Sequence, residues 1–134
     1  MSSNPERSEA KKVTTKTLLR MKARGEKISA LTAYDHLMAE RIDQAGVDLI
    51  LVGDSVATVV QGFDSTVAVS MENMLYHASL VSRAVQRALV VGDLPFMSYQ
   101  VNSDEALRNA GQMVQKAGVE AVKIEGGEVI APTV

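Results

Sequence analysis

Acidic side chains follow three apolar stretches of this sequence, at the point where each stretch ends. They are Asp54, with Ser55 beside it, Asp93 and Glu125, and Lys123 precedes the last of them by two residues. Carboxylates that are brought together repel one another unless a cation lies between them. An all-oxygen ligand set favours Mg²⁺ over Zn²⁺, and such an ion can polarise a carbonyl group and stabilise an enolate. The pattern therefore predicts a magnesium site, and the lysine predicts an anionic substrate group such as a carboxylate.

Each of these residues also has a purely structural interpretation. A single aspartate after a strand is often a helix N-cap. Lys123 and Glu125, which are two residues apart, share one face of a strand, so an ion pair inside the protein fits them as well as a substrate contact does. Both alternatives stay open at this point. His77 lies inside an amphipathic helical pattern, which predicts a partly buried, hydrogen-bonded histidine and not a metal ligand.

The stretches that carry the acidic residues have the composition of strands that are buried on both faces. Their Leu, Ile and Val residues run without polar alternation, which is typical of a parallel sheet covered by helices. The strands are predicted at residues 27–35, 47–52, 88–92 and 119–124. Because the carboxyl ends of parallel strands meet at one edge, we expect the acidic side chains to converge there.

Helical patterns alternate with these strands. They cover residues 14–24, 36–45, 71–89 and 102–117, and the last residues of the third overlap the strand predicted at 88–92. Asp35, Ser70 and Asn102 are predicted N-caps. Residues 53–69 are predicted to be a long functional loop. Strand and helix in alternation predict right-handed crossovers and an α/β barrel, whereas a dinucleotide-binding fold is disfavoured because no Gly-x-Gly-x-x-Gly follows a strand.

Composition limits the classes of protein and of partner. With 134 residues, 46% of them hydrophobic, the chain is of single-domain size, and we expect a tail at 1–12 and one domain at 13–134. A net charge of -2 argues against a nucleic-acid partner. No apolar run approaches the roughly 18 residues of a membrane span, so no membrane partner is expected. The absence of cysteine fits a reducing compartment, and a cytoplasmic location is predicted.

Five motifs together resemble the ketopantoate hydroxymethyltransferase (3-methyl-2-oxobutanoate hydroxymethyltransferase) family. In chain order they are Thr32-Ala33-Tyr34-Asp35, Leu51-Val52-Gly53-Asp54-Ser55, Gln61-Gly62-Phe63-Asp64-Ser65-Thr66, Asp93-Leu94-Pro95-Phe96-Met97 and Val122-Lys123-Ile124-Glu125-Gly126-Gly127. The resemblance implies a (β/α)₈ TIM barrel related to the phosphoenolpyruvate/pyruvate superfamily. It also implies transfer of a hydroxymethyl group from 5,10-methylenetetrahydrofolate to 3-methyl-2-oxobutanoate, which gives 2-dehydropantoate in pantothenate biosynthesis, and a homo-oligomeric assembly.

The same resemblance implies roles for the residues at the strand ends. Asp54 and Asp93 would bind Mg²⁺ directly, and Glu125 would complete the metal site. Ser55, with Asp54 and Asp93, would contact the oxo acid, and Lys123 would hold its carboxylate. The metal would acidify the C3 proton of the substrate, and the resulting enolate would attack the one-carbon unit of the folate.

One departure from the family concerns length. Family members are about twice as long, and their general base, a glutamate, lies beyond Val134. We therefore expect about the first four βα units of an incomplete barrel, which turns over poorly, if at all, on its own. Two other interpretations are a lyase of the same superfamily that acts on another 2-oxo acid, and a non-catalytic truncated subunit.

Overall fold

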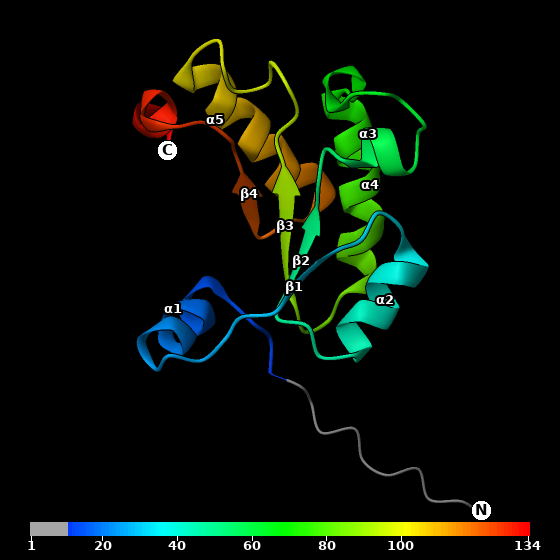
Figure 1. The fold of residues 1–134 in the computed structure, drawn as a ribbon, viewed down its shortest axis with the longest axis vertical. Coiled ribbons are helices and arrows are strands. Elements are labelled where there is room, and N and C mark those ends of the chain that lie inside the picture. Colours follow the sequence, from blue (N-terminus) through cyan, green and yellow to red (C-terminus); the bar gives the residue numbers. More distant parts are fainter. Residues whose placement is uncertain (1–10) are drawn as a thin grey trace, which may run out of the picture.

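Four parallel strands form one sheet in the order β1-β2-β3-β4 (Figure 1). The computed structural model describes residues 11–134, so the first ten residues of the predicted tail lie outside the described part. The strands are β1 (Ala30–Thr32), β2 (Leu49–Val52), β3 (Leu89–Asp93) and β4 (Ala121–Lys123). Each strand pairs in parallel with the next along the chain, which confirms the predicted parallel sheet.

Within residues 11–134, five α-helices connect or flank the strands. They are α1 (Thr15–Ala23), α2 (His36–Gln44), α3 (Val56–Val59), α4 (Met71–Ala84) and α5 (Ser103–Gln112). The three predicted N-caps are confirmed, because the side chains of Asp35, Ser70 and Asn102 each accept a hydrogen bond from the backbone N–H three residues ahead. Each cap satisfies one of the N–H groups that a first helical turn leaves unpaired.

The helix predicted over 71–89 is shorter in the structure and ends at Ala84. Beyond it, the carboxylate of Asp43 accepts hydrogen bonds from the backbone N–H groups of Gln86, Arg87 and Ala88, at 2.7–3.2 Å. These N–H groups therefore do not form the hydrogen bonds that would continue the helix, and the chain leads into β3. The contact joins residues about 44 positions apart, so the local pattern contained no sign of it.

Other predicted elements also differ from the structure. The first strand covers three residues and not the predicted nine, and all three are exposed. The predicted loop at 53–69 contains the short helix α3 and a 3-10 turn, Thr66–Ala68. The predicted helix at 102–117 changes after α5 into a π-helical turn, Met113–Ala117, which ends at Gly118 in the left-handed conformation. Residues Glu128–Thr133 form a further 3-10 helix.

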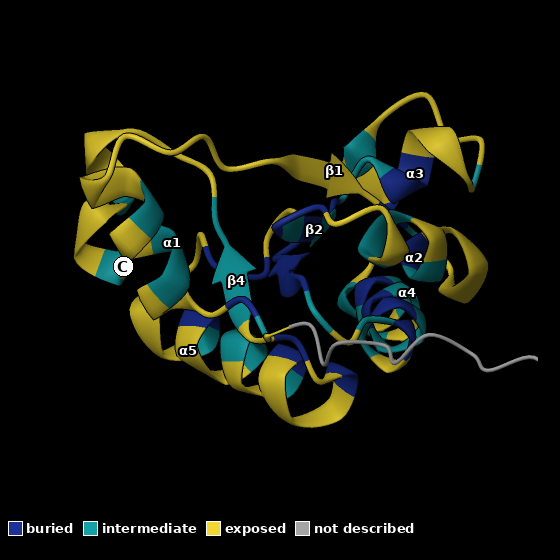
Figure 2. Ribbon diagram, turned by 90° about the horizontal axis from the view of Figure 1, so that it is seen from below, coloured by how far each residue is buried: buried dark blue, intermediate teal, exposed yellow. Residues whose placement is uncertain are grey.

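Apolar side chains cover both faces of the central strands β2 and β3, as their unalternated sequences predicted, whereas β1 is exposed. Ile50, Val52 and Val90 belong to the larger core cluster, which is shared with α2, α4 and the α5 region. Leu89 and Val91 point to the other face and form a smaller cluster with Val13. The buried strands β2 and β3 lie between exposed helical surfaces (Figure 2). This arrangement holds the strand ends, and the residues that follow them, in fixed positions.

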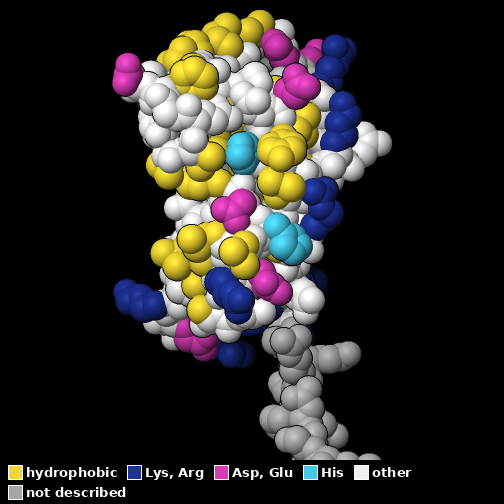
Figure 3. Space-filling view, turned by 90° about the vertical axis from the view of Figure 1, so that its right-hand side faces the viewer, with side chains coloured by type: hydrophobic (Ala, Val, Ile, Leu, Met, Phe, Trp, Pro, Cys, Tyr) yellow, Lys and Arg dark blue, Asp and Glu magenta, His cyan; other side chains and the backbone are white. Residues whose placement is uncertain are grey.

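The face formed by α2, α3 and α4 carries a mixed surface (Figure 3). Hydrophobic and acidic side chains and imidazoles are interspersed there, and the lysines and arginines gather along one edge and at one end. Within residues 11–134, no helix is long and apolar enough to cross a membrane.

Candidate functional site

The predicted residues meet at the carboxyl ends of β2, β3 and β4. Asp93 is the last residue of β3 and Lys123 the last residue of β4, and the two are direct partners in the parallel register. Asp54 and Glu125 each come two residues after the end of a strand. The edge of the sheet therefore gathers three carboxylates and one ammonium group, as expected for parallel strands.

Asp93 is at the centre of this group and is only 4% exposed. One carboxylate oxygen, Oδ2, accepts a hydrogen bond of 3.1 Å from the backbone N–H of Asp54. The other, Oδ1, lies 2.8 Å from the Nζ atom of Lys123. The same Nζ donates to Glu125 Oε1 at 2.6 Å, so the lysine bridges two carboxylates. The ion pair that was one of the two interpretations of Lys123 is present, with Glu125 on its exposed side.

The surroundings shift the pKa values of these groups in different directions. Burial raises the pKa of the Asp93 carboxyl above its ordinary value, although Lys123 and the N–H of Asp54 oppose the shift. Burial alone would lower the pKa of Lys123, but the hydrogen bonds and charges of Asp93 and Glu125 outweigh it and raise the pKa. The hydrogen bond from Lys123 lowers the pKa of Glu125. The ammonium thus stabilises the ionised form of both neighbouring carboxylates.

A cavity of about 240 Å³ opens at this edge of the sheet, and all three carboxylates line it. Its walls are completed by Thr66 and Val67, from the segment after β2, and by Leu94, Phe96, Tyr99 and Gln100, from the segment after β3. The cavity is thus lined by carboxylates and other polar side chains together with apolar ones. Such a combination suits a small anionic molecule with an aliphatic part.

The donors at this cavity have the right chemistry for a hard divalent cation. They are carboxylate oxygens, which Mg²⁺ prefers, and Lys123 already supplies positive charge to two of them. Among the described residues, the carboxylate of Asp54 accepts no hydrogen bond, so its oxygens are available as ligands. Within residues 11–134, no three acidic or imidazole side chains surround a common point closely enough to form a metal cluster. The three carboxylates fit Mg²⁺ in donor type and share one cavity.

Ser55 is not among the residues that line the cavity, and its hydroxyl contacts that of Tyr34. The two hydroxyl oxygens are 2.7 Å apart, and the backbone carbonyl of Tyr34 lies 2.8 Å from Nδ1 of His77. The predicted hydrogen-bonded state of His77 is confirmed. Gly53 makes this packing possible, because a Cβ atom there would lie 2.9 Å from Oγ of Ser55. Tyr34 was part of a motif in the sequence, but nothing in that motif indicated its contact with Ser55.

Tyr99 was not among the candidate residues, yet it lines the cavity beside the three carboxylates. Its ring is 6% exposed, and its hydroxyl oxygen accepts a hydrogen bond of 3.2 Å from the backbone N–H of Glu125. The only signal available in the sequence was its position, a few residues after Asp93 in the segment that leaves β3. Position alone did not separate it from ordinary loop residues.

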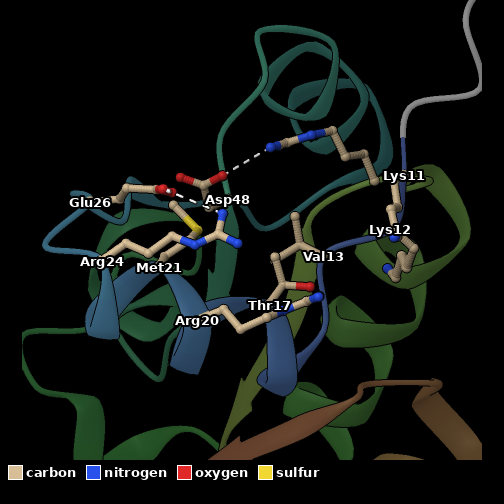
Figure 4. A pocket seen from close by; sticks show the side chains of 10 residues that line it. Lys11, Lys12, Val13, Thr17, Arg20, Met21, Arg24, Glu26 and Asp48 are labelled. Atoms are coloured by element: carbon tan, nitrogen blue, oxygen red, sulfur yellow. Dashed lines mark hydrogen bonds and ion pairs between the residues drawn. The ribbon is translucent and has the colours of Figure 1, made fainter.

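A second cavity, of about 370 Å³, lies at the opposite end of the strands, between α1 and the starts of β2 and β3 (Figure 4). None of the predicted site residues lines it. Its two acidic side chains are both paired with arginines, Asp48 with Arg87 at 2.9 Å and Glu26 with Arg24 at 3.7 Å. Arg87 also donates to the carbonyls of Gly46 and Val47. Arg87 thereby links the segments that enter β2 and β3.

Replacing Asp48 by asparagine is expected to lower the free energy of unfolding by about 2 kcal/mol at neutral pH. The carboxylate of Asp48, 8% exposed as a residue, accepts hydrogen bonds from the N–H and hydroxyl of Ser29 and from Arg87. Burial alone would raise its pKa, but these hydrogen bonds lower the pKa below the ordinary value of 3.8. Its stabilising effect is therefore complete above that value and is lost as the pH falls through the lowered pKa of the folded state.

Urea unfolding of the parent chain and of Asp48→Asn at neutral and acidic pH measures this effect. The difference between the two should shrink as the pH falls below the ordinary aspartate pKa. Asp64→Asn, at an exposed position, should match the parent chain at each pH. A penalty for Asp48→Asn that stays constant into acid would contradict the assignment.

Comparison with known proteins identifies close relatives over nearly the whole chain. Residues 12–134 match the family model described as ketopantoate hydroxymethyltransferase. Proteins named 3-methyl-2-oxobutanoate hydroxymethyltransferase are 53% identical over 127 residues in Syntrophus aciditrophicus (strain SB) and 56% identical over 128 residues in Cytophaga hutchinsonii. These alignments cover 95% and 96% of this chain and 47% of each relative. The chain thus spans about half the length of the curated relatives it matches.

Solved structures with the same fold are more distant in sequence. A phosphonopyruvate hydrolase in complex with oxalate and Mg²⁺ superimposes with a TM-score of 0.64 at 20% identity, covering 81% of this chain and 38% of that one. A 2,3-dimethylmalate lyase of the PEP mutase/isocitrate lyase superfamily gives 0.60 at 21% identity, covering 80% and 38%. At such identities the likeness concerns the fold alone. The described strands and helices are part of a (β/α)₈ barrel, as predicted.

Proposed function

The chain belongs to the ketopantoate hydroxymethyltransferase family, and from that premise we propose that its strand ends bind Mg²⁺ and 3-methyl-2-oxobutanoate. The reaction would be transfer of a hydroxymethyl group from 5,10-methylenetetrahydrofolate to the oxo acid, which gives 2-dehydropantoate. The observation that carries the proposal is that Asp54, Asp93 and Glu125 line one cavity, with Lys123 in contact with two of them. The lyase alternative has only the shared fold in its favour.

We propose that Asp54 and Asp93 bind the metal ion directly and that Glu125 completes the metal site. Their oxygens come from three neighbouring strand ends and suit a hard divalent cation. When bound, Mg²⁺ supplies a Lewis acid that polarises the oxo group of the substrate and makes its C3 proton more acidic. Asp93 is the ligand whose position is most firmly fixed, because its two oxygens contact the N–H of Asp54 and the ammonium of Lys123.

The remaining groups bind and orient the oxo acid. Lys123 contacts two of the carboxylates that line the cavity and would pair with the substrate carboxylate, exchanging part of its present contact with Glu125. Ser55 would add a hydrogen bond from its hydroxyl, which Tyr34 now holds. The apolar wall, Val67 and Phe96, would receive the branched aliphatic part of the substrate. Binding and orientation are the roles proposed for residues 11–134, and abstraction of the C3 proton is assigned to none of them.

Isothermal titration calorimetry of the chain with 3-methyl-2-oxobutanoate tests this proposal. Binding is expected in the presence of Mg²⁺ and not in the presence of a chelator. Asp54→Asn should weaken the Mg²⁺-dependent binding by at least about tenfold, because it removes an anionic ligand with free oxygens.

Asp104→Asn is the matched control, because Asp104 is an exposed aspartate in the first turn of α5 and does not line the cavity. It should bind like the parent chain. Equal binding by the parent chain and Asp54→Asn, or binding that ignores Mg²⁺, would refute the proposed metal site.

A further inference from the structure

We propose that Tyr99 is a substrate-binding residue, whose hydroxyl donates a hydrogen bond to an oxygen of the bound 2-oxo acid. The proposal rests on the proposed function, since it takes the same cavity as the substrate site. It adds a neutral donor to a set of residues that otherwise consists of carboxylates, a lysine and a serine.

The position of Tyr99 is fixed by the segment that follows β3. Ser98, which is buried, donates from its hydroxyl to the carbonyl of Pro95 at 2.6 Å, and its own carbonyl accepts a hydrogen bond of 2.7 Å from Nδ2 of Asn109 on α5. The ring of Tyr99 packs in the larger core cluster. Tyr99, which lines the cavity, is therefore held in place by its own burial and by a segment tied to a helix.

The hydrogen bonds of the hydroxyl leave its proton free for a ligand. A phenol has one O–H donor, and its oxygen also accepts hydrogen bonds. The oxygen of Tyr99 accepts the backbone N–H of Glu125 at 3.2 Å, so the proton must point elsewhere. In the part of the chain that the structure describes, no acceptor for this proton lies within hydrogen-bond distance. The cavity is the open space beside it.

The other two tyrosines differ from Tyr99 in this respect. The hydroxyl of Tyr34 is paired with the hydroxyl of Ser55. Tyr76 lies on α4, is 61% exposed, and contacts the ring of His77 edge-on at 5.2 Å between centroids. Of the three tyrosines in the sequence, Tyr99 is the one that lines the cavity with the three carboxylates. A bound oxo acid would bring oxygen acceptors for the proton of the Tyr99 hydroxyl into this cavity. The carboxylates of the cavity are already assigned to the metal as its proposed ligands.

Tyr99→Phe, measured by calorimetry in Mg²⁺, is the test. The variant keeps the buried ring, and its affinity for 3-methyl-2-oxobutanoate should fall about tenfold, as for one lost hydrogen bond in a site built to make it. Its affinity for Mg²⁺ alone should stay within about twofold of the parent value, which a general loosening of the site would not allow. Tyr76→Phe should leave both affinities unchanged.

A spectroscopic readout tests the same contact independently of calorimetry. The chain has three tyrosines and no tryptophan, so its near-ultraviolet absorbance reports the tyrosines. Adding the oxo acid with Mg²⁺ should shift the tyrosine band of the parent chain and of Tyr76→Phe, and should shift that of Tyr99→Phe less, because only the contribution of Tyr34, the partner of Ser55, remains. Equal oxo-acid affinity in parent and Tyr99→Phe, or a band shift as large in Tyr99→Phe as in the parent chain, overturns the inference alone. No binding by the parent chain overturns the proposed function, and the inference with it.

Discussion

Replacing Asp93 by asparagine is expected to lower the Mg²⁺-dependent affinity for 3-methyl-2-oxobutanoate by more than about 100-fold. This loss is larger than the one typical of residues that hydrogen-bond to a metal ligand but do not bind the metal themselves. Asp93 is the most buried of the three carboxylates and contacts both the N–H of Asp54 and the ammonium of Lys123. Asparagine has nearly the same shape, and its side-chain oxygen can still accept one of these hydrogen bonds. The loss therefore reports the missing negative charge.

The experiment compares the parent chain, Asp93→Asn and Asp104→Asn by calorimetry with Mg²⁺ and then with the oxo acid. Urea unfolding of each variant establishes that the fold is retained. Asp104→Asn should behave as the parent chain does. An Asp93→Asn chain that is folded and binds the oxo acid within a few-fold of the parent would exclude Asp93 as a ligand of the metal.

The second large effect is expected from Gly92→Ala, which should lower the free energy of unfolding by about 2 kcal/mol. Gly92 lies in β3 next to Asp93, and a Cβ atom there would come within 2.2 Å of Cε of Met113 and 3.2 Å of Cγ1 of Val119. Met113 is completely buried, so its flexible end has little room to move away. The added methyl group must push the end of the Met113 side chain aside within a packed core.

Two further variants separate this clash from a general effect of losing a glycine. Gly111→Ala, in α5, meets nothing within 4 Å and should raise the free energy of unfolding by about 0.5–1 kcal/mol, because alanine favours a helix. Met113→Ala removes the atom that clashes, so Gly92→Ala should cost less in that background than in the parent chain. Urea unfolding measures the parent chain, the three single variants and the double variant of Gly92→Ala with Met113→Ala. A Gly92→Ala cost that is the same with and without the Met113 side chain would contradict the packing argument.

Most of the helices and strands could be predicted because their signals are local. Asp35, Ser70 and Asn102 each form an N-cap with an N–H group three residues away, and this spacing is visible in the sequence. Strands whose apolar residues do not alternate with polar ones were predicted to be buried on both faces. The two apolar clusters, one on each face of β2 and β3, confirm this prediction. The ends of the elements were less certain. For example, the hydrogen bonds of the Asp43 carboxylate with the backbone after α4 contribute to ending that helix, and no local sequence pattern contains these contacts.

The candidate site divides in the same way. The sequence by itself determined that four residues, Asp54, Asp93, Lys123 and Glu125, would share one edge of the sheet. The reason is that they follow or end apolar strands, and the carboxyl ends of parallel strands lie at the same edge. Only the tertiary structure decided that Lys123 bridges Asp93 and Glu125. The same holds for the contact of Tyr34 with Ser55 and for that of Tyr99 with Glu125. These last contacts join residues 21 and 26 positions apart. A hydrogen bond between distant segments depends on how the loops pack over the strand ends, and neither composition nor periodicity encodes that packing.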